Sequence, residues 1–336
     1  MEIKFSKNGL TLDEINNLIA YKSPKIKGSN LESELYGSGQ VYRKYGRVHS
    51  CLPIRFIIPH GPSFFDTIPN WFHNINHSKI GFFTKRHCED AASNGVRKEN
   101  ILHISSPFYL YYRMNQIQIR KTPKKGSIYF IAHSSEYSTL ENTNQLVVDF
   151  ILNNPPEHLK PISVCLYYID VEKFGVDEFL KNNIPVFVLG HKENRNFCKN
   201  YFNIVSNFQF MLTNKIGSHI LYAIMMDQKY YVFDEHFISE SLDDNEKVLL
   251  SNCKDGLKDY YKLKGGEISW VEKKEIAERL LGVNVKISLW KIFLLFFEGV
   301  KIDWKFLKLL IRNYRIVLKN GYELKIIRLL NVNKRK

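Results

Sequence analysis

The chain has 336 residues, a length that favours two domains rather than one compact core. Its 44% hydrophobic and 14% aromatic content is ample for globular cores. The formal net charge of +14 calls for an anionic partner, namely nucleic acid, an anionic membrane or a phosphorylated substrate.

Several classes are excluded at this stage. The five cysteines are scattered without a CxxC pair, which argues against a zinc site of that type and against a disulfide framework. The first residues lack the apolar core of a signal peptide, and no apolar run approaches the roughly 20 residues of a membrane span. We therefore expect a cytoplasmic protein in a reducing compartment.

The first part of the chain predicts short α/β units. Thr11 and Glu14 have the spacing of a helix capping box, and the Gly/Ser-rich residues 28–39 predict a loop. Basic residues 120–126, RKTPKKG, predict a linker. The expected strands, each ending in polar or Gly/Pro residues, are 55–58, 79–84 and 101–104.

The middle of the chain alternates strands and helices more clearly. We expect strands at 128–132, 161–168, 185–189, 208–212 and 230–233. The expected helices are 146–153, 176–183, 195–205 and 217–226. This rhythm predicts a parallel, doubly wound sheet.

The last part, residues 285–336, is apolar and basic. It holds 13 Lys and Arg against three acidic residues, a net charge of +10. Trp290, Phe293, Phe297 and Trp304 alternate with lysines, which suits an amphipathic helix on anionic lipid. The alternative is a helix that packs its apolar face on the protein and exposes its basic face to solvent.

Two turns after predicted strands carry groups that suit phosphate. His133, Ser134 and Ser135 follow one strand and can donate hydrogen bonds to an anion. The second turn begins at the end of another strand and leads into a predicted helix start, where backbone N–H groups bind anions. Its residues are Thr213, Asn214, Gly217, Ser218 and His219. Ordinary capped helices are the alternative for each turn.

Two further groups complete the predicted site. Tyr168, Asp170, Gly190 and His191 lie near strand ends where a base and ribose can bind, although packing is the commoner role of such aromatics. In the first domain, His60 and Asp66 follow a strand and are candidate general bases for an acceptor hydroxyl; a structural turn is the alternative. No DxD triplet follows a strand, so we expect no metal ion and no other cofactor.

The two anion turns carry a resemblance to a known family. The segment IYFIAHSSE resembles the histidine motif of bacterial sialyltransferases, and TNKIGSHILYA resembles their Ser/Thr motif. Serine follows His133 where many of these enzymes have proline, and their acidic-acidic-glycine motif has no clean match. The resemblance covers about residues 126–235 and implies a GT-B-like α/β fold of two Rossmann-like domains with parallel sheets and a basic helical tail. The expected boundaries are 1–123, 124–284 and 285–336.

The resemblance implies a metal-independent glycosyltransferase of lipopolysaccharide O-antigen or capsule synthesis. It would move sialic acid from CMP-sialic acid, with inversion, to a lipid-linked oligosaccharide at the inner face of the cytoplasmic membrane. CMP-Kdo is the second donor, and a sugar-phosphate or pyruvyl transferase on the same scaffold stays open. A basic nucleic-acid-binding protein is the alternative of another class, although no such motif is evident.

Overall fold

A computed structural model describes residues 1–65, 67–68, 78–122, 124–134, 143–153, 155–233, 255–265, 268–285 and 287–297. Predicted site residues Asp66 and Ser135, and the basic residues 298–336, lie outside these ranges.

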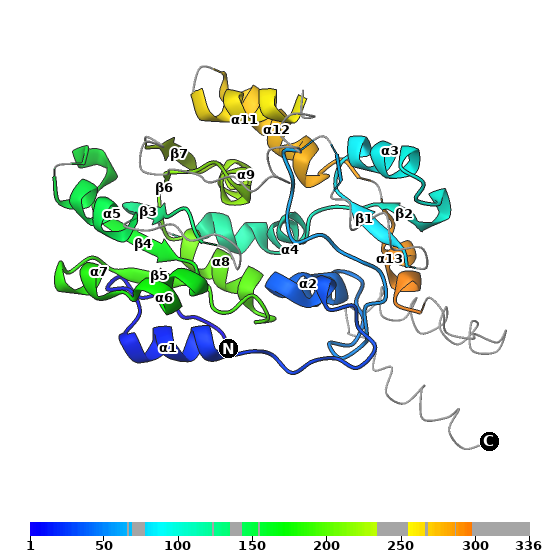
Figure 1. Cartoon of the computed structure of the whole chain (residues 1–336), viewed down its shortest axis with the longest axis horizontal. Helices are drawn as coiled ribbons and strands as arrows, with labels where there is room; N and C mark the ends of the chain where they lie inside the picture. The colour runs from blue at the N-terminus through cyan, green and yellow to red at the C-terminus, as the bar shows by residue number, and fades with distance from the viewer. Residues whose placement is uncertain are drawn as a thin grey trace.

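A five-stranded parallel sheet organises the larger part of the fold (Figure 1). Its strands are β3 (Ser127–Phe130), β4 (Ile162–Leu166), β5 (Val186–Val188), β6 (Phe210–Thr213) and β7 (Lys229–Val232). Their order is β5-β4-β3-β6-β7. β3 is therefore the central strand. The next two strands in sequence, β4 and β5, lie on one side of it, and β6 and β7 lie on the other. This places a topological switch point between β3 and β6, whose residues Phe130 and Thr213 are register partners.

Helices connect these strands, as the sequence predicts, although it does not predict the helix at 168–174. They are α5 (Thr143–Leu152), α6 (Tyr168–Phe174), α7 (Asp177–Lys181), α8 (Phe197–Val205) and α9 (Ser218–Met225). The continuous apolar run in β4 fits its complete burial. The predicted strand at 161–168 is too long, because Tyr167 is extended and Tyr168 already begins α6.

A smaller parallel sheet forms the other part. It contains β1 (Ile80–Phe82) and β2 (Ile101–His103), and Ile57 adds a parallel bridge to Ile80. Around it lie α2 (Ser38–Tyr45), α3 (Lys85–Ser93), α4 (Pro107–Lys121) and the short 3-10 helices η1 (Glu32–Gly37) and η3 (Lys98–Asn100). Another 3-10 helix, η4 (Glu157–Leu159), precedes β4.

Three expectations for this part are wrong. The strand expected at 55–58 is only the isolated bridge at Ile57. Residues 28–39 are not a single loop, because η1 and α2 begin there, with a kink at Leu35 and Tyr36. A Cβ at Gly39 would lie 2.6 Å from the Glu34 carboxylate, so this glycine serves close packing and not flexibility. The predicted linker is partly helix, because α4 continues through Lys121 before Pro123.

The first residues of the chain pack on the larger sheet. The N–H of Leu10 donates to the carbonyl of Val186 in β5 at 2.8 Å, and the N–H of Ile3 donates to Asn200 Oδ1 at 3.0 Å. Figure 1 shows α1 (Leu12–Ala20) beside β5 and α6 as a result. The predicted domain boundaries stay a prediction.

The described helices after residue 254 lead from the larger part back to the smaller one. They are α11 (Asp255–Gly265), α12 (Trp270–Leu281), which packs on α9, and α13 (Leu289–Leu295). The end of α12 and α13 contact the smaller part. Ile292, Phe293 and Phe296 are buried, and Phe296 meets the ring of Phe56 edge to face at 6.0 Å. The described start of the tail, through Phe297, is thus packed on the protein. Within the described ranges no helix is both long and apolar enough to cross a bilayer.

The predicted α/β fold class with parallel sheets is confirmed for the described residues, whereas most of the predicted basic helical tail lies outside them. The chain is α/β, both sheets are parallel, and residues that follow strands of the two sheets meet at one pocket, as in a GT-B-like arrangement.

Candidate functional site

A cavity of about 360 Å³ lies at the carboxyl edge of the five-stranded sheet. Residues that follow β3, β4, β5 and β6 line it on one side. Tyr36, His60 and Gly61 from the smaller part line it on the other. The cavity therefore lies at the switch point where open parallel sheets bind ligands, and its volume falls in the range of small-molecule sites.

The start of α9 supplies the anion-binding wall. Gly217 is the N-cap, and Lys215, Gly217 and Ser218 all line the cavity. A Cβ at Gly217 would lie 3.0 Å from the His219 ring, so only glycine keeps the first turn open without a shift. The first N–H groups of a helix have no intrahelical partner and attract negative charge.

Thr213 fixes the turn that carries Lys215. Its hydroxyl donates to the carbonyl of Lys215 at 2.8 Å and accepts from the N–H of Lys215 at 3.2 Å. Since the hydroxyl proton is used on this carbonyl, the 3.1 Å contact with His219 Nε2 is best satisfied by an Nε2–H donor. Burial, with the nearby His133, lowers the pKa of His219 to about 3. His219 is therefore a neutral group that offers Nδ1 as an acceptor, not a positive charge.

Two buried side chains hold the turn that carries His133 by accepting hydrogen bonds from its backbone. The N–H of Ala132 donates to Asn214 Oδ1 at 2.7 Å, and the N–H of Ser134 donates to Asp170 Oδ1 at 2.9 Å. Burial raises the pKa of Asp170, while the hydrogen bonds from Ser134 act in the opposite direction. His133 itself is exposed, and its Nδ1–H donates to the carbonyl of Ser134 at 2.9 Å.

The opposite wall is built around Tyr36. Its hydroxyl lies 2.8 Å from that of Tyr167, and its backbone is left-handed, with φ +56°. A non-glycine residue in this conformation is a sign of local constraint, which is commonest at functional sites. Burial and then the neighbouring Tyr36 hydroxyl raise the pKa of Tyr167, so the Tyr167 phenol stays protonated.

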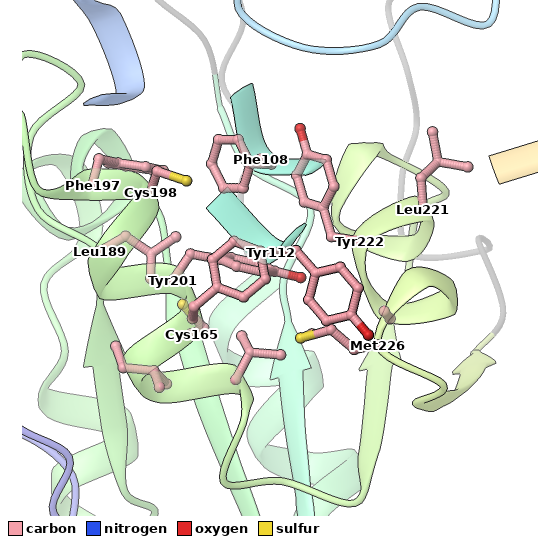
Figure 2. Close-up of a cluster of buried hydrophobic side chains, with 14 of the residues drawn as sticks. Phe108, Tyr112, Cys165, Leu189, Phe197, Cys198, Tyr201, Leu221, Tyr222 and Met226 are labelled. Atoms are coloured by element: carbon pink, nitrogen blue, oxygen red, sulfur yellow. The ribbon is translucent and has the colours of Figure 1, made fainter. Parts of the chain in front are cut away.

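The floor of the cavity is aromatic. Phe108 stacks on Tyr222 with ring centroids 4.4 Å apart, and Tyr201 meets Tyr222 edge to face at 5.5 Å. Figure 2 shows these three side chains in one buried cluster with Cys165. Burial raises the pKa of the Cys165 thiol, so it is an unreactive packing group.

The structure separates the predicted residues into two sets. Those that line the cavity are His60, His133, Gly190, Gly217, Ser218 and His219. Those buried behind its lining are Ser134, Tyr168, Asp170, His191, Thr213 and Asn214. Of the latter, Thr213, Asn214 and Asp170 hold the two turns, and the ring of Tyr168 packs against His191 at 4.4 Å.

Some lining residues were missed. Lys215 lies inside the second turn and was open to sequence reasoning, because a lysine beside a helix start suits an anion. Tyr36 was hidden, because it comes from a segment read as a loop and reaches the site only through tertiary packing. The same holds for Glu32, whose carboxylate contacts His60.

No known family model and no curated protein matches this sequence. Solved structures give distant likenesses. UDP-GlcNAc 2-epimerase from Neisseria meningitidis bound to UDP-GlcNAc aligns with TM-score 0.32 and 10% identity over 70% of this chain and 62% of that chain. HepE from Anabaena in complex with UDP-glucose aligns with TM-score 0.27 and 10% identity over 68% and 64%, respectively. The chain thus spans less than two thirds of the length of either structure.

Proposed function

We propose that the protein is a GT-B-type glycosyltransferase that uses a nucleotide sugar. The observation that supports this most strongly is the cavity at the switch point, which Lys215 and the start of α9 line together with His60. A nucleoside monophosphate leaving group needs this chemistry, and an acceptor hydroxyl needs a base near it.

CMP-sialic acid is the proposed donor, with CMP-Kdo second. The choice rests on the resemblance of the His133 and Ser218 turns to the motifs of bacterial sialyltransferases. The proposed acceptor is a lipid-linked oligosaccharide of O-antigen, lipopolysaccharide or capsule synthesis. Neither choice follows from the dimensions of the cavity.

The proposed reaction is one in-line displacement with inversion. The acceptor oxygen forms the new bond to the anomeric carbon as its proton passes to His60 or Asp66. The bond from the anomeric carbon to the phosphate oxygen breaks, and CMP leaves with the electron pair. Lys215, His133 and the N–H groups at Ser218 stabilise the developing phosphate charge, each fixed donor contributing roughly 3–4 kcal/mol at most. No metal ion is needed for this step.

The basic residues 298–336 are proposed to hold the enzyme on the anionic inner face of the cytoplasmic membrane, close to a lipid-linked acceptor. Flotation with vesicles of phosphatidylcholine alone and with added phosphatidylglycerol tests this. Binding only to the anionic vesicles is expected. Equal recovery with both vesicles, or none with either, would remove the membrane role.

A thermal-shift screen against CMP, UDP, GDP and dTDP tests the donor class. Stabilisation by CMP is expected, by about 2.7 kcal/mol when the nucleotide is present at 100 times its Kd. Stabilisation by UDP alone would overturn the choice of a CMP sugar while leaving a nucleotide site in place.

Turnover is tested with CMP-sialic acid and a lipooligosaccharide acceptor, read by product mass. His133→Ala should nearly abolish transfer while the protein stays folded. His158→Ala is the matched control, because His158 is an exposed histidine in η4, before β4 and away from the carboxyl edge. Wild-type turnover by His133→Ala would remove His133 from the mechanism.

A further inference from the structure

We propose that Glu32 is the positioning residue of a carboxylate–imidazole pair in which His60 is the general base. This inference rests on the proposed function. The carboxylate of Glu32 lies 2.5 Å from His60 Nε2, and His60 lines the cavity.

The pair lies on a segment that is tied to the larger part of the fold. Glu32 and Tyr36 both belong to η1, and the N–H of Tyr36 donates to the carbonyl of Lys192 at 2.7 Å. The Tyr36 ring contacts the His60 ring at 5.5 Å and the Phe197 ring at 5.0 Å, edge to face in both cases. The His60 ring therefore has one carboxylate and one aromatic ring as neighbours.

The pair also lies beside the anion wall. A Cβ at Gly61, the residue after His60, would lie 3.8 Å from Ser218 Oγ and 3.7 Å from the Tyr222 hydroxyl. The loop that carries the base thus lies close to the helix start that would hold the leaving phosphate. In an in-line displacement the base and the leaving group must share one small site.

The close contact of Nε2 with the Glu32 carboxylate decides which nitrogen acts. A carboxylate accepts, so Nε2 carries the proton and Nδ1 keeps its lone pair. The acceptor O–H gives its proton to Nδ1 as the oxygen bonds to the anomeric carbon and CMP departs with the electrons of the broken C–O bond. Glu32 then faces an imidazolium and stabilises its charge without taking the proton.

Stability alone does not account for this pair. The side chains of His60 and Glu32 are 41% and 29% exposed, and ion pairs this accessible contribute about 0–1 kcal/mol to folding. Glu32→Gln should therefore leave the thermal midpoint nearly unchanged. A loss of turnover in that variant then reports on catalysis and not on folding.

The experiment has a spectroscopic arm that needs no substrate. In the full-length protein with 15N-labelled histidine, long-range 1H–15N spectra should show His60 as the Nε2–H tautomer. Glu32→Ala should give a mixture of tautomers, whereas an unchanged His60 signal in that variant would overturn the proposal.

The kinetic arm uses CMP-sialic acid and lipooligosaccharide. Glu32→Gln should lower kcat about 10- to 100-fold and leave the KM for the donor unchanged. This reduction is smaller than the roughly 100- to 10,000-fold reduction expected when a general base itself is lost. Glu32→Asp should restore part of the loss, and Glu157→Gln, an exposed ion-pair glutamate before β4, should match wild type.

The two hypotheses fail differently. Wild-type kcat in Glu32→Gln, with transfer intact, overturns the role of Glu32 and leaves the glycosyltransferase standing. Absence of transfer from CMP-sialic acid and CMP-Kdo, with no stabilisation by any of the four nucleotides, overturns the proposed function, and the role of His60 as base falls with it.

Discussion

Replacing Arg43 by methionine should destabilise the protein strongly. The Arg43 side chain is fully buried, and its Nε donates to the carbonyl of Leu52 at 2.6 Å. Its two terminal nitrogens form a bidentate pair with the carboxylate of Glu34, and Nη2 also donates to Ser29 Oγ at 3.2 Å. Methionine fills much of the volume but leaves the carboxylate of Glu34, 16% exposed, without its charge partner.

Breaking a buried pair on one side costs about 3–5 kcal/mol, because one charge stays buried and unpaired. At about 2.1 cal/mol/K per residue, unfolding of all 336 residues as one unit has an entropy near 0.7 kcal/mol/K. The thermal midpoint of Arg43→Met should therefore fall by about 4–7 °C. Arg43→Lys should also be less stable than wild type, since the ammonium group of lysine cannot form the bidentate pair that the guanidinium group forms with Glu34.

Differential scanning calorimetry and urea unfolding measure this effect. The double variant Arg43→Met/Glu34→Met removes both charges and should recover a large part of the loss, giving a coupling energy well above zero in the double-mutant cycle. A midpoint within 1 °C of wild type for Arg43→Met, or additive single and double variants, would refute the role assigned to the pair. Because Glu34 lies in η1 between Glu32 and Tyr36, Arg43→Met should also lower turnover.

Three further predictions concern the anion wall and its support. Lys215→Ala should weaken CMP binding about tenfold or more by calorimetric titration, whereas Lys229→Ala, an exposed lysine in β7, should not; equal affinities would exclude Lys215 from the site. Gly217→Ala should weaken CMP binding at nearly unchanged thermal midpoint, because the new Cβ meets the His219 ring at 3.0 Å, and unaltered affinity would show that the turn accommodates it. His219 has a pKa lowered from 6.5 to about 3, so between these values only the unfolded chain takes up the proton and stability is lost as pH falls. From pH 7 to pH 5 the loss of folding free energy amounts to up to about 2 kcal/mol. In His219→Gln the thermal midpoint should therefore fall less over this pH range than in wild type. An equal fall in both proteins would contradict this assignment.

The parts of the fold that sequence reasoning found are those with local signals. β3, β4 and β6 are apolar runs ended by polar residues, and the switch point between β3 and β6 follows from their order in a doubly wound sheet. The same reasoning placed His133 and Ser218 at one edge, and both line the cavity.

The parts that it missed depend on contacts between distant segments. Gly37 and Gly39 suggest a loop by composition, yet the buried Arg43–Glu34 pair holds a helical segment there. His60 is far from Lys215 in sequence, and only tertiary packing, with η1 on α8, brings His60 and its neighbour Glu32 to the cavity that Lys215 lines. A pattern of residue types along the chain does not contain that information.

The docking of the first residues on β5 has a consequence for synthesis on the ribosome. Leu10 bonds to Val186, so its partner is made 176 residues later. At a synthesis rate of about 5–20 residues per second, roughly 9–35 seconds pass between the synthesis of Leu10 and that of Val186 in β5. During that time α1 has only its own capping box of Thr11 and Glu14, and a helix of nine residues is marginal alone. Residues 1–20 thus cannot dock before Val186 has been made, and until then the apolar residues Ile15 and Leu18 are available to a chaperone.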